Sequence, residues 1–218
     1  MSGFPGSPRT LTGGFVEMDS EGKKVLRTIA FQYNPDSLTR TITPRIAKTD
    51  TGDRLESLRL TGPPAETIKI DIELDATDRL ERPGDNPETV ASGIAPELAD
   101  LEMMVTPASG DLEAANRLAS TGTIEVLPLP SPMLLLVLGS NRTLPVRIND
   151  FSIVEEAFDV NLNPIRARIS LGLRLLSIDD LAYGSKGAEL FMVSLKRREQ
   201  LSRRKPPAIQ SLGLRSAP

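Results

Sequence analysis

Regular alternation of apolar and polar residues predicts that most of this chain forms β-strands. The most regular example is the segment 66–75, which has four apolar residues at every second position and charged residues between them. A period of two over this length is typical of an antiparallel strand with one buried and one solvated face. The apolar face comprises Ile68, Ile70, Ile72 and Leu74, and the charged face comprises Lys69, Asp71, Glu73 and Asp75.

Other segments show the same pattern more weakly. Two β-prone runs on either side of a turn containing Gly22 predict a hairpin. The clearest helix is predicted at 95–105, with Pro96 in its first turn and an apolar stripe along one side, and a shorter helix is predicted at 111–119. The segments 50–59 and 76–87 are expected to be loops. The predicted strands are 14–18, 25–31, 38–46, 66–75, 123–127, 133–138, 144–156 and 165–176.

This order of elements predicts a mainly β (α+β) fold. Successive strands around one central helix favour a β-barrel or a two-sheet antiparallel sandwich with one flanking helix. We expect a flexible N-terminal arm at 1–12, a β domain at 13–185 and a basic C-terminal extension at 186–218.

Composition excludes several kinds of chemistry. The 218 residues include no His and no Cys, which removes imidazole acid–base catalysis, thiolate nucleophiles, Cys/His zinc sites and disulfides. The formal net charge of −3 gives no general attraction to nucleic acid. The longest apolar run, at 133–138, is far too short for a membrane helix. We therefore expect a soluble protein without cofactor or metal, without membrane insertion and without a nucleic-acid partner.

Two Asn-Pro turns stand beside predicted strands, one near each end of the β region. The first follows Phe31 and Tyr33 as Asn34-Pro35, and the second is Asn163-Pro164. Proline fixes φ and removes a backbone donor, while asparagine readily accepts turn conformations. These residues are therefore interpreted as structural turns that end strands.

Five motifs in order resemble the tube-like proteins of contractile injection systems, which build phage-tail-like particles. They are Phe31-x-Tyr33-Asn34-Pro35, Gly62-Pro63-Pro64 before the strand ending at Asp75, a helix with Leu98 and Leu101, the strand from Pro132 to Gly139, and Pro164-Ile165-Arg166-Ala167. The chain departs from the family at Leu138, where members usually carry Trp. We also expect no C-terminal LysM domain, which many longer members carry, because the basic tail is too short for one.

The resemblance implies a structural component that forms a hexameric ring. It implies a tube initiator or hub adaptor that joins the inner tube to the baseplate spike. The implied partners are the spike, inner-tube and baseplate subunits, and assembly into a virion-like particle is expected in the cytoplasm. The alternative within this class is the repeating inner-tube protein. The alternatives from another class are a small-molecule-binding β-barrel and a carboxylate-dependent enzyme, but no catalytic residues are assigned.

Two groups of residues are candidates for contacts between subunits. Arg166 and Arg168 share one strand face, as do Asp71 and Glu73. These four residues are either an ordinary solvated surface or a candidate subunit interface. The two arginines could alternatively line the lumen of a ring. A cation site at the acidic residues is the less favoured interpretation.

The C-terminal segment is basic, although the whole chain is acidic. Its charged residues predict a docking arm that binds an acidic groove on a neighbouring protein. The segment is expected to be helical to about residue 204, because Pro206-Pro207 prevents a longer helix. The candidate docking residues are Lys196, Arg197, Arg198, Arg203, Arg204 and Lys205.

Overall fold

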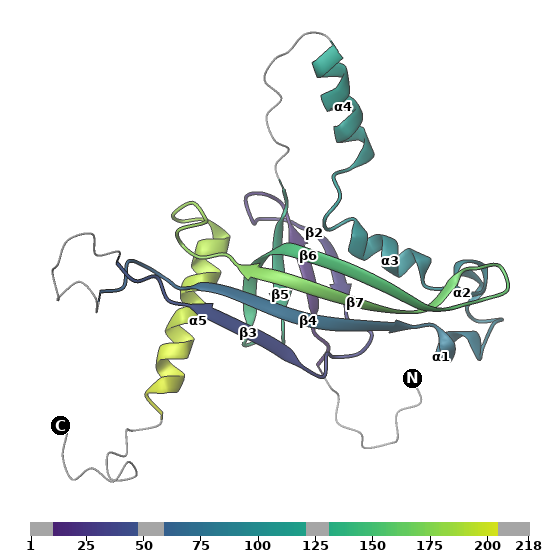
Figure 1. Ribbon diagram of the computed structural model, residues 1–218, viewed down its shortest axis with the longest axis horizontal. Helices are drawn as coiled ribbons and strands as arrows, with labels where there is room; N and C mark the ends of the chain where they lie inside the picture. Colours follow the sequence, from purple (N-terminus) through teal and green to yellow (C-terminus); the bar gives the residue numbers. More distant parts are fainter. Residues whose placement is uncertain (1–10, 48–58, 121–130, 205–218) are drawn as a thin grey trace.

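The computed structural model describes residues 11–47, 59–120 and 131–204. A seven-stranded antiparallel sheet with the order β2-β1-β5-β6-β7-β4-β3 forms the centre of the molecule (Figure 1). Its strands are β1 (Gly14–Met18), β2 (Val25–Ala30), β3 (Leu38–Thr43), β4 (Ala65–Asp75), β5 (Met133–Val137), β6 (Thr143–Phe158) and β7 (Pro164–Leu175). The predicted mainly β, α+β class is confirmed.

The sheet is not closed into a barrel, which corrects the closed form of the prediction. Among the described residues, β2 pairs only with β1 and β3 pairs only with β4, so both strands are edges. The alternating pattern showed that each strand has a buried face, but a barrel and a bent open sheet both satisfy that pattern. Strand pairing between distant segments decides between them.

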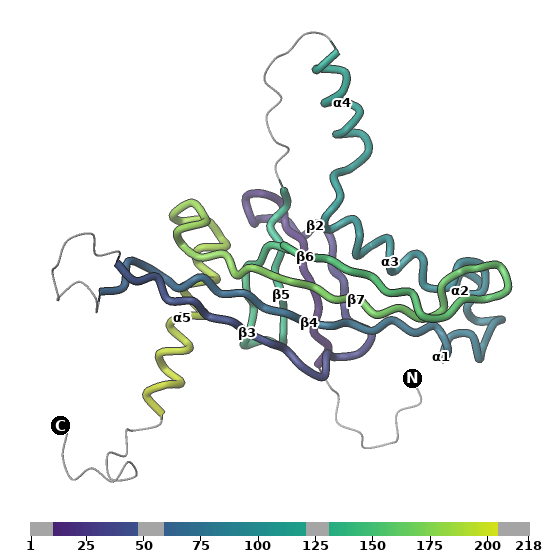
Figure 2. Tube along the Cα trace, in the orientation of Figure 1, coloured from purple at the N-terminus to yellow at the C-terminus, as the bar shows by residue number. Residues whose placement is uncertain are grey.

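The long strand β6 joins two differently oriented halves of the sheet. Its first residues, Thr143–Val146, pair with β5, and it continues along β7 to the far end of the molecule. The register shifts between Ile148 and Asp150, opposite Gly172. Gly172 leaves room for the Asp150 side chain, which would lie 2.6 Å from an added Cβ. Bulges increase local bending, and in Figures 1 and 2 β1, β2 and β5 run across the direction of β4 and β7.

One hydrophobic core fills the space enclosed by the bent sheet. Phe15 and Phe31 meet edge to face with ring centroids 5.3 Å apart. The apolar faces of both sheet halves contribute, and burying each large side chain stabilises the fold by roughly 1.5–3 kcal/mol. The central residues include Phe15, Ile68, Ile70, Ile72, Leu134, Leu136, Leu171, Leu173 and Phe191.

Five helices surround the sheet in the described part of the chain: α1 (Thr77–Leu80), α2 (Pro87–Ser92), α3 (Ala95–Glu102), α4 (Ser109–Ser120) and α5 (Lys186–Ser202). Helices α1 to α3 cluster near the tip of the β6–β7 hairpin, whereas α4 projects away from the sheet (Figures 1 and 2). Helix α5 lies near the opposite end. Its N-cap Ser185 accepts a hydrogen bond from the amide of Ala188, and its buried Phe191 joins the core.

The element predictions hold in most of the described chain. The strand at 66–75 and the helices at 95–105 and 111–119 correspond to β4, α3 and α4. The expected loop at 76–87 instead contains α1, which is too short to leave a periodic signal. Helix α5 occupies much of the predicted C-terminal extension and ends at Ser202. The predicted strand at 123–127, and most of the predicted arm at 1–12 and loop at 50–59, lie outside the described residues.

Candidate functional site

The charged face of β4 and β7 brings together the four residues predicted as a subunit interface. The antiparallel register places Asp71 opposite Ser170, Glu73 opposite Arg168, and Asp75 opposite Arg166. Arg168 Nη2 lies 3.2 Å from Glu73 Oε1, and Ser170 Oγ donates to Asp71 Oδ1 over 2.7 Å. Opposite charges on directly facing strand positions stabilise the pairing by roughly 0.2–1 kcal/mol each.

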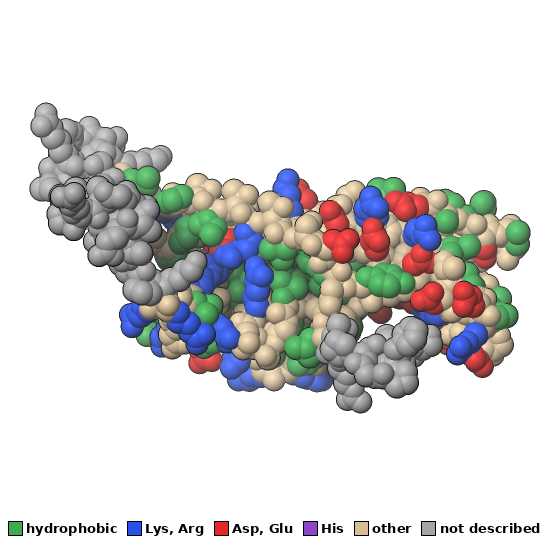
Figure 3. Space-filling model, turned by 90° about the horizontal axis from the view of Figure 1, so that it is seen from below, with side chains coloured by type: hydrophobic (Ala, Val, Ile, Leu, Met, Phe, Trp, Pro, Cys, Tyr) green, Lys and Arg blue, Asp and Glu red, His purple; other side chains and the backbone are tan. Residues whose placement is uncertain are grey.

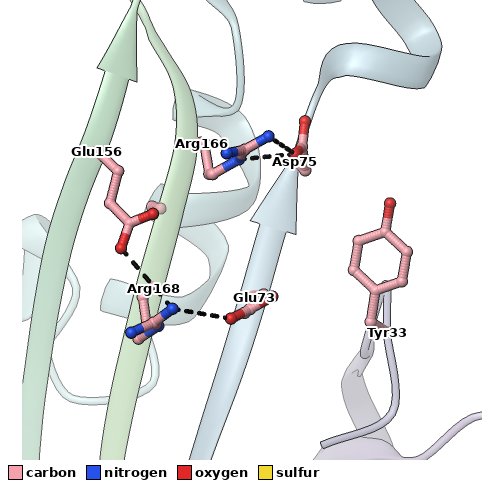
Figure 4. Close-up of a pocket in the computed structure, with 7 residues that line it drawn as sticks. Tyr33, Glu73, Asp75, Glu156, Arg166 and Arg168 are labelled. Atoms are coloured by element: carbon pink, nitrogen blue, oxygen red, sulfur yellow. Dashed lines mark hydrogen bonds and ion pairs between the residues drawn. The ribbon is translucent and has the colours of Figure 1, made fainter.

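Asp75 is the most constrained carboxylate of this face. Arg166 donates to its Oδ2 through Nε at 2.8 Å, and Arg166 Nη2 lies 2.7 Å from the same oxygen (Figure 4). Thr77 donates to its Oδ1 through its backbone amide and its hydroxyl group. Burial would raise the pKa of the Asp75 carboxyl, but the bonds from Thr77 and Arg166 outweigh burial and lower its pKa. Asp75 therefore stays ionised near neutral pH.

A shallow hollow of about 320 Å³ lies over this charged face. The carboxylates and guanidiniums in it point toward one another, and Tyr33 lies on the other side of β4 (Figure 4). Its lining residues are Tyr33, Glu73, Asp75, Glu156, Arg166, Ala167 and Arg168. The arginines and carboxylates in the hollow are paired with one another. In the described chain, no group of three His, Cys, Asp or Glu residues is arranged to hold a metal ion.

The first Asn-Pro turn ties the N-terminal segment and β4 together. The Asn34 amide accepts from the Gly13 backbone amide and donates to the Leu11 carbonyl, both over 2.9 Å. Gln32, between the two aromatic residues, exchanges two hydrogen bonds with the backbone of Asp75. The turn thus fixes the end of β4 beside the charged face.

The second Asn-Pro turn anchors the tip of the β6–β7 hairpin to the helices. Asn163 donates to the Ala91 carbonyl over 3.1 Å, and the Pro164 carbonyl accepts from the Ile94 amide over 2.8 Å. Gly93 has φ of +60°, and an added Cβ would lie 2.0 Å from the Pro164 carbonyl oxygen. This close approach explains why the junction between α2 and α3 uses glycine.

Beyond this anchor, the hairpin tip carries apolar side chains in solvent. Asp159 closes the turn by accepting hydrogen bonds from the backbone amides of Asn161 and Asn163. Val160 is 98% exposed and Leu162 is 78% exposed. Periodicity did not identify this tip, because its exposure depends on how far the hairpin extends past the sheet.

The predicted docking residues lie on or just after α5, except Lys205, which lies outside the described residues. They do not form a single free arm. Arg198 Nη1 lies 2.9 Å from Glu66 Oε2, and Arg40 Nη2 lies 2.6 Å from Glu66 Oε1. Glu66 is only 1% exposed, and charged residues are almost never fully buried unless paired.

Glu66 is the important residue that the sequence interpretation missed. The sequence around it was sufficient to find it. Glu66 lies an even number of positions before Ile68, Ile70 and Ile72, so the alternation along the strand places it on the buried face. A carboxylate in phase with a core face predicts a buried ion pair, although its arginine partners come from distant segments.

No protein-family model matches the chain, and no curated protein matches it. Among solved structures, a chain of the "Virion of native gene transfer agent (GTA) particle" is similar. The match has 12% sequence identity and a TM-score of 0.27, and it covers 75% of this chain and 90% of that chain. A similarity this low carries no argument about function. In the described ranges, no helix has both the length and the apolar character needed to cross a bilayer.

Proposed function

We propose that this protein is a structural subunit of a contractile injection particle, forming a hexameric ring that joins the inner tube to the baseplate spike. The ordered motifs from Phe31 to Ala167 support the class and the six-fold symmetry through their resemblance to tube-like proteins. The inner tube, the spike and baseplate subunits are the proposed partners, with assembly in the cytoplasm. The repeating inner-tube protein is the alternative position.

The observation that carries the proposal is the open sheet with apolar side chains at both edges. Val25 and Leu26 on β2 are 52% and 51% exposed, and Ile42 on β3 is 48% exposed. An unpaired strand edge is a template for pairing with another chain. Pairing β2 of one copy with β3 of the next is a head-to-tail contact, and such contacts close into rings when the rotation permits.

The charged face has a positioning role in this proposal. Its arginines are already paired within the chain, so it acts as a fixed pattern of alternating charge and not as a set of free cations. Such patterns select partners and register more than they add affinity. The basic end of α5 is a second proposed contact, made with an acidic surface of the spike or a baseplate subunit.

Edge pairing is tested by placing a charge on each edge strand. We expect Leu26→Lys and Ile42→Lys to abolish ring formation when the protein is produced together with its neighbouring gene products, because edge lysines block strand addition. Light scattering and negative-stain images measure the assembly. Val90→Lys is the matched control, since Val90 is 44% exposed on α2, away from both edges.

The control should form rings as the wild type does, and all three variants should keep the wild-type melting temperature. Wild-type protein that stays monomeric with its partners present would contradict the proposal. So would a cryo-EM map of the particle in which the chain is trimeric or lies off the particle axis.

We also propose that the chain has no enzymatic activity. The absence of His and Cys from the sequence and the pairing of the carboxylates around Asp75 with arginine or serine support this. A broad hydrolase and transferase screen should give no turnover. Turnover that Asp71→Asn or Glu73→Gln removes without unfolding would refute it and favour the carboxylate-dependent enzyme.

A further inference from the structure

A basic hollow of about 340 Å³ lies where α5, β3 and the β5–β6 turn meet. In Figure 3, Lys and Arg side chains gather around a hollow at one end of the molecule, while Asp and Glu side chains gather toward the other. The hollow is lined by Arg40, Asn141, Arg142, Leu144, Ser194, Arg197, Arg198 and Leu201. It is distinct from the charged face of β4 and β7.

The charges of this hollow are not balanced within the described chain. Arg40 and Arg198 share the single carboxylate of Glu66. No hydrogen bond or ion pair joins the side chain of Arg142 or Arg197 to any other described residue. Four guanidinium groups therefore face one carboxylate, which leaves an excess of three positive charges in a concave site.

The surroundings of Arg142 make this imbalance costly. Burial lowers the pKa of Arg142, and the nearby charges of Arg40 and Arg198 lower it further, while Glu66 only partly opposes them. Like charges held close together destabilise a fold unless a counter-ion joins them. The free protein thus maintains a site that an anion would stabilise.

We infer that this hollow binds an acidic peptide segment of a partner protein, with carboxylates paired to Arg142 and Arg197. Glu66 already shows that arginines of this cluster hold a carboxylate from two sides, at 2.6 and 2.9 Å. Leu201, which is 50% exposed, provides an apolar contact for the methylene groups of a glutamate, and Asn141 and Ser194 provide polar ones.

The lining favours carboxylates over nucleic acid. Single-stranded nucleic acid is normally held by aromatic side chains that stack on bases beside a basic groove, and no aromatic residue of the described chain lines this hollow. Arginine pairs in a two-pronged way with carboxylate and phosphate alike, so the preference for carboxylates rests on the lack of stacking residues. The inference rests on the contact proposed for the basic end of α5 and deepens it by naming the residues that bind, whereas ring formation is tested separately through the edge strands.

The test uses fluorescein-labelled hexaglutamate as the probe and the full-length protein at low ionic strength. We expect binding that weakens as salt rises, and a loss of about tenfold or more for both Arg142→Gln and Arg197→Gln, since each removes a charge-assisted hydrogen bond. Neither substitution removes an internal ion pair, so both variants should keep or exceed the wild-type melting temperature.

Lys24→Gln is the matched control, because Lys24 is an exposed cation between β1 and β2 and does not line the hollow. It should change affinity by less than about twofold, because an exposed charge outside the site is largely screened. An equal loss in this control would show that only general charge attraction operates and would overturn the inference. Absence of binding by the wild type would also overturn it. So would tighter Arg142-dependent binding of pyrophosphate or of a single-stranded oligonucleotide of matched charge.

Discussion

Removing the charge of Glu66 should destabilise the protein far more than removing an exposed carboxylate of the same strand. In Glu66→Gln the side chain keeps nearly the same shape but can no longer balance Arg40 and Arg198. Those arginine side chains are 30% and 37% exposed, whereas Glu66 is 1% exposed. Two hydrogen bonds between charged groups contribute roughly 1.5–3 kcal/mol each, and partial exposure of the arginines reduces their sum.

We therefore expect the free energy of unfolding to fall by about 3 kcal/mol, at the lower end of the cost of breaking a buried ion pair. In a chain of this size, 1 kcal/mol shifts the melting temperature by about 2–4 °C, so the midpoint should fall by about 6–12 °C. Urea unfolding gives the free energy, and calorimetry gives the midpoint. Glu73→Gln is the control, because its pair with Arg168 is more than half exposed on both sides and should contribute less than about 1 kcal/mol.

The difference between wild type and Glu66→Gln should also depend on pH. Burial raises the pKa of the Glu66 carboxyl, but the hydrogen bonds and charges of Arg40 and Arg198 outweigh it, so the folded-state pKa lies below the ordinary value of 4.5. A depressed carboxyl pKa stabilises the fold above the unfolded-state pKa, and this contribution is lost as pH falls through the folded-state value.

The difference should therefore be complete at neutral pH and shrink below about pH 4.5. Equal losses in Glu66→Gln and Glu73→Gln at neutral pH would refute the reasoning. A difference that grew on acidification would refute it as well.

Two further substitutions test the Asn-Pro turns. Gly93→Ala should destabilise by about 2 kcal/mol or more, because it combines a positive φ with a clash against the Pro164 carbonyl, whereas Gly84→Ala, with open space around it, should change the free energy by less than about 0.5 kcal/mol. Equal effects in urea unfolding would contradict this. Asn34→Ala should lower the free energy of unfolding by about 1–2 kcal/mol, because it loses two hydrogen bonds to the segment before β1. Asn161→Ala is the control, since the Asn161 side chain makes no such bonds among the described residues. If calorimetry gave Asn34→Ala a midpoint no lower than that of Asn161→Ala, the two hydrogen bonds would not be needed for the turn.

The sequence by itself determined the local structure of most elements. A side-chain period of two is a property of one strand, so the pattern of Ile68, Ile70 and Ile72 was enough to predict β4 and its buried face. The same holds for the stripe of α3, and for Pro164, which begins β7. The position of Glu66 on the buried face could also be predicted, since it depends only on the alternation along β4.

The tertiary structure decided which strands become neighbours. Nothing local to β4 or β7 requires Glu73 to face Arg168, because that contact depends on the register between segments 95 residues apart. For the same reason, only the fold shows that β3, β4 and α5 bring Arg40, Glu66 and Arg198 into one cluster. The pattern within a strand determines which of its faces is buried, whereas pairing between distant segments determines which strands are neighbours and which lie at the sheet edges. The open sheet and the basic hollow therefore could not be predicted from the sequence.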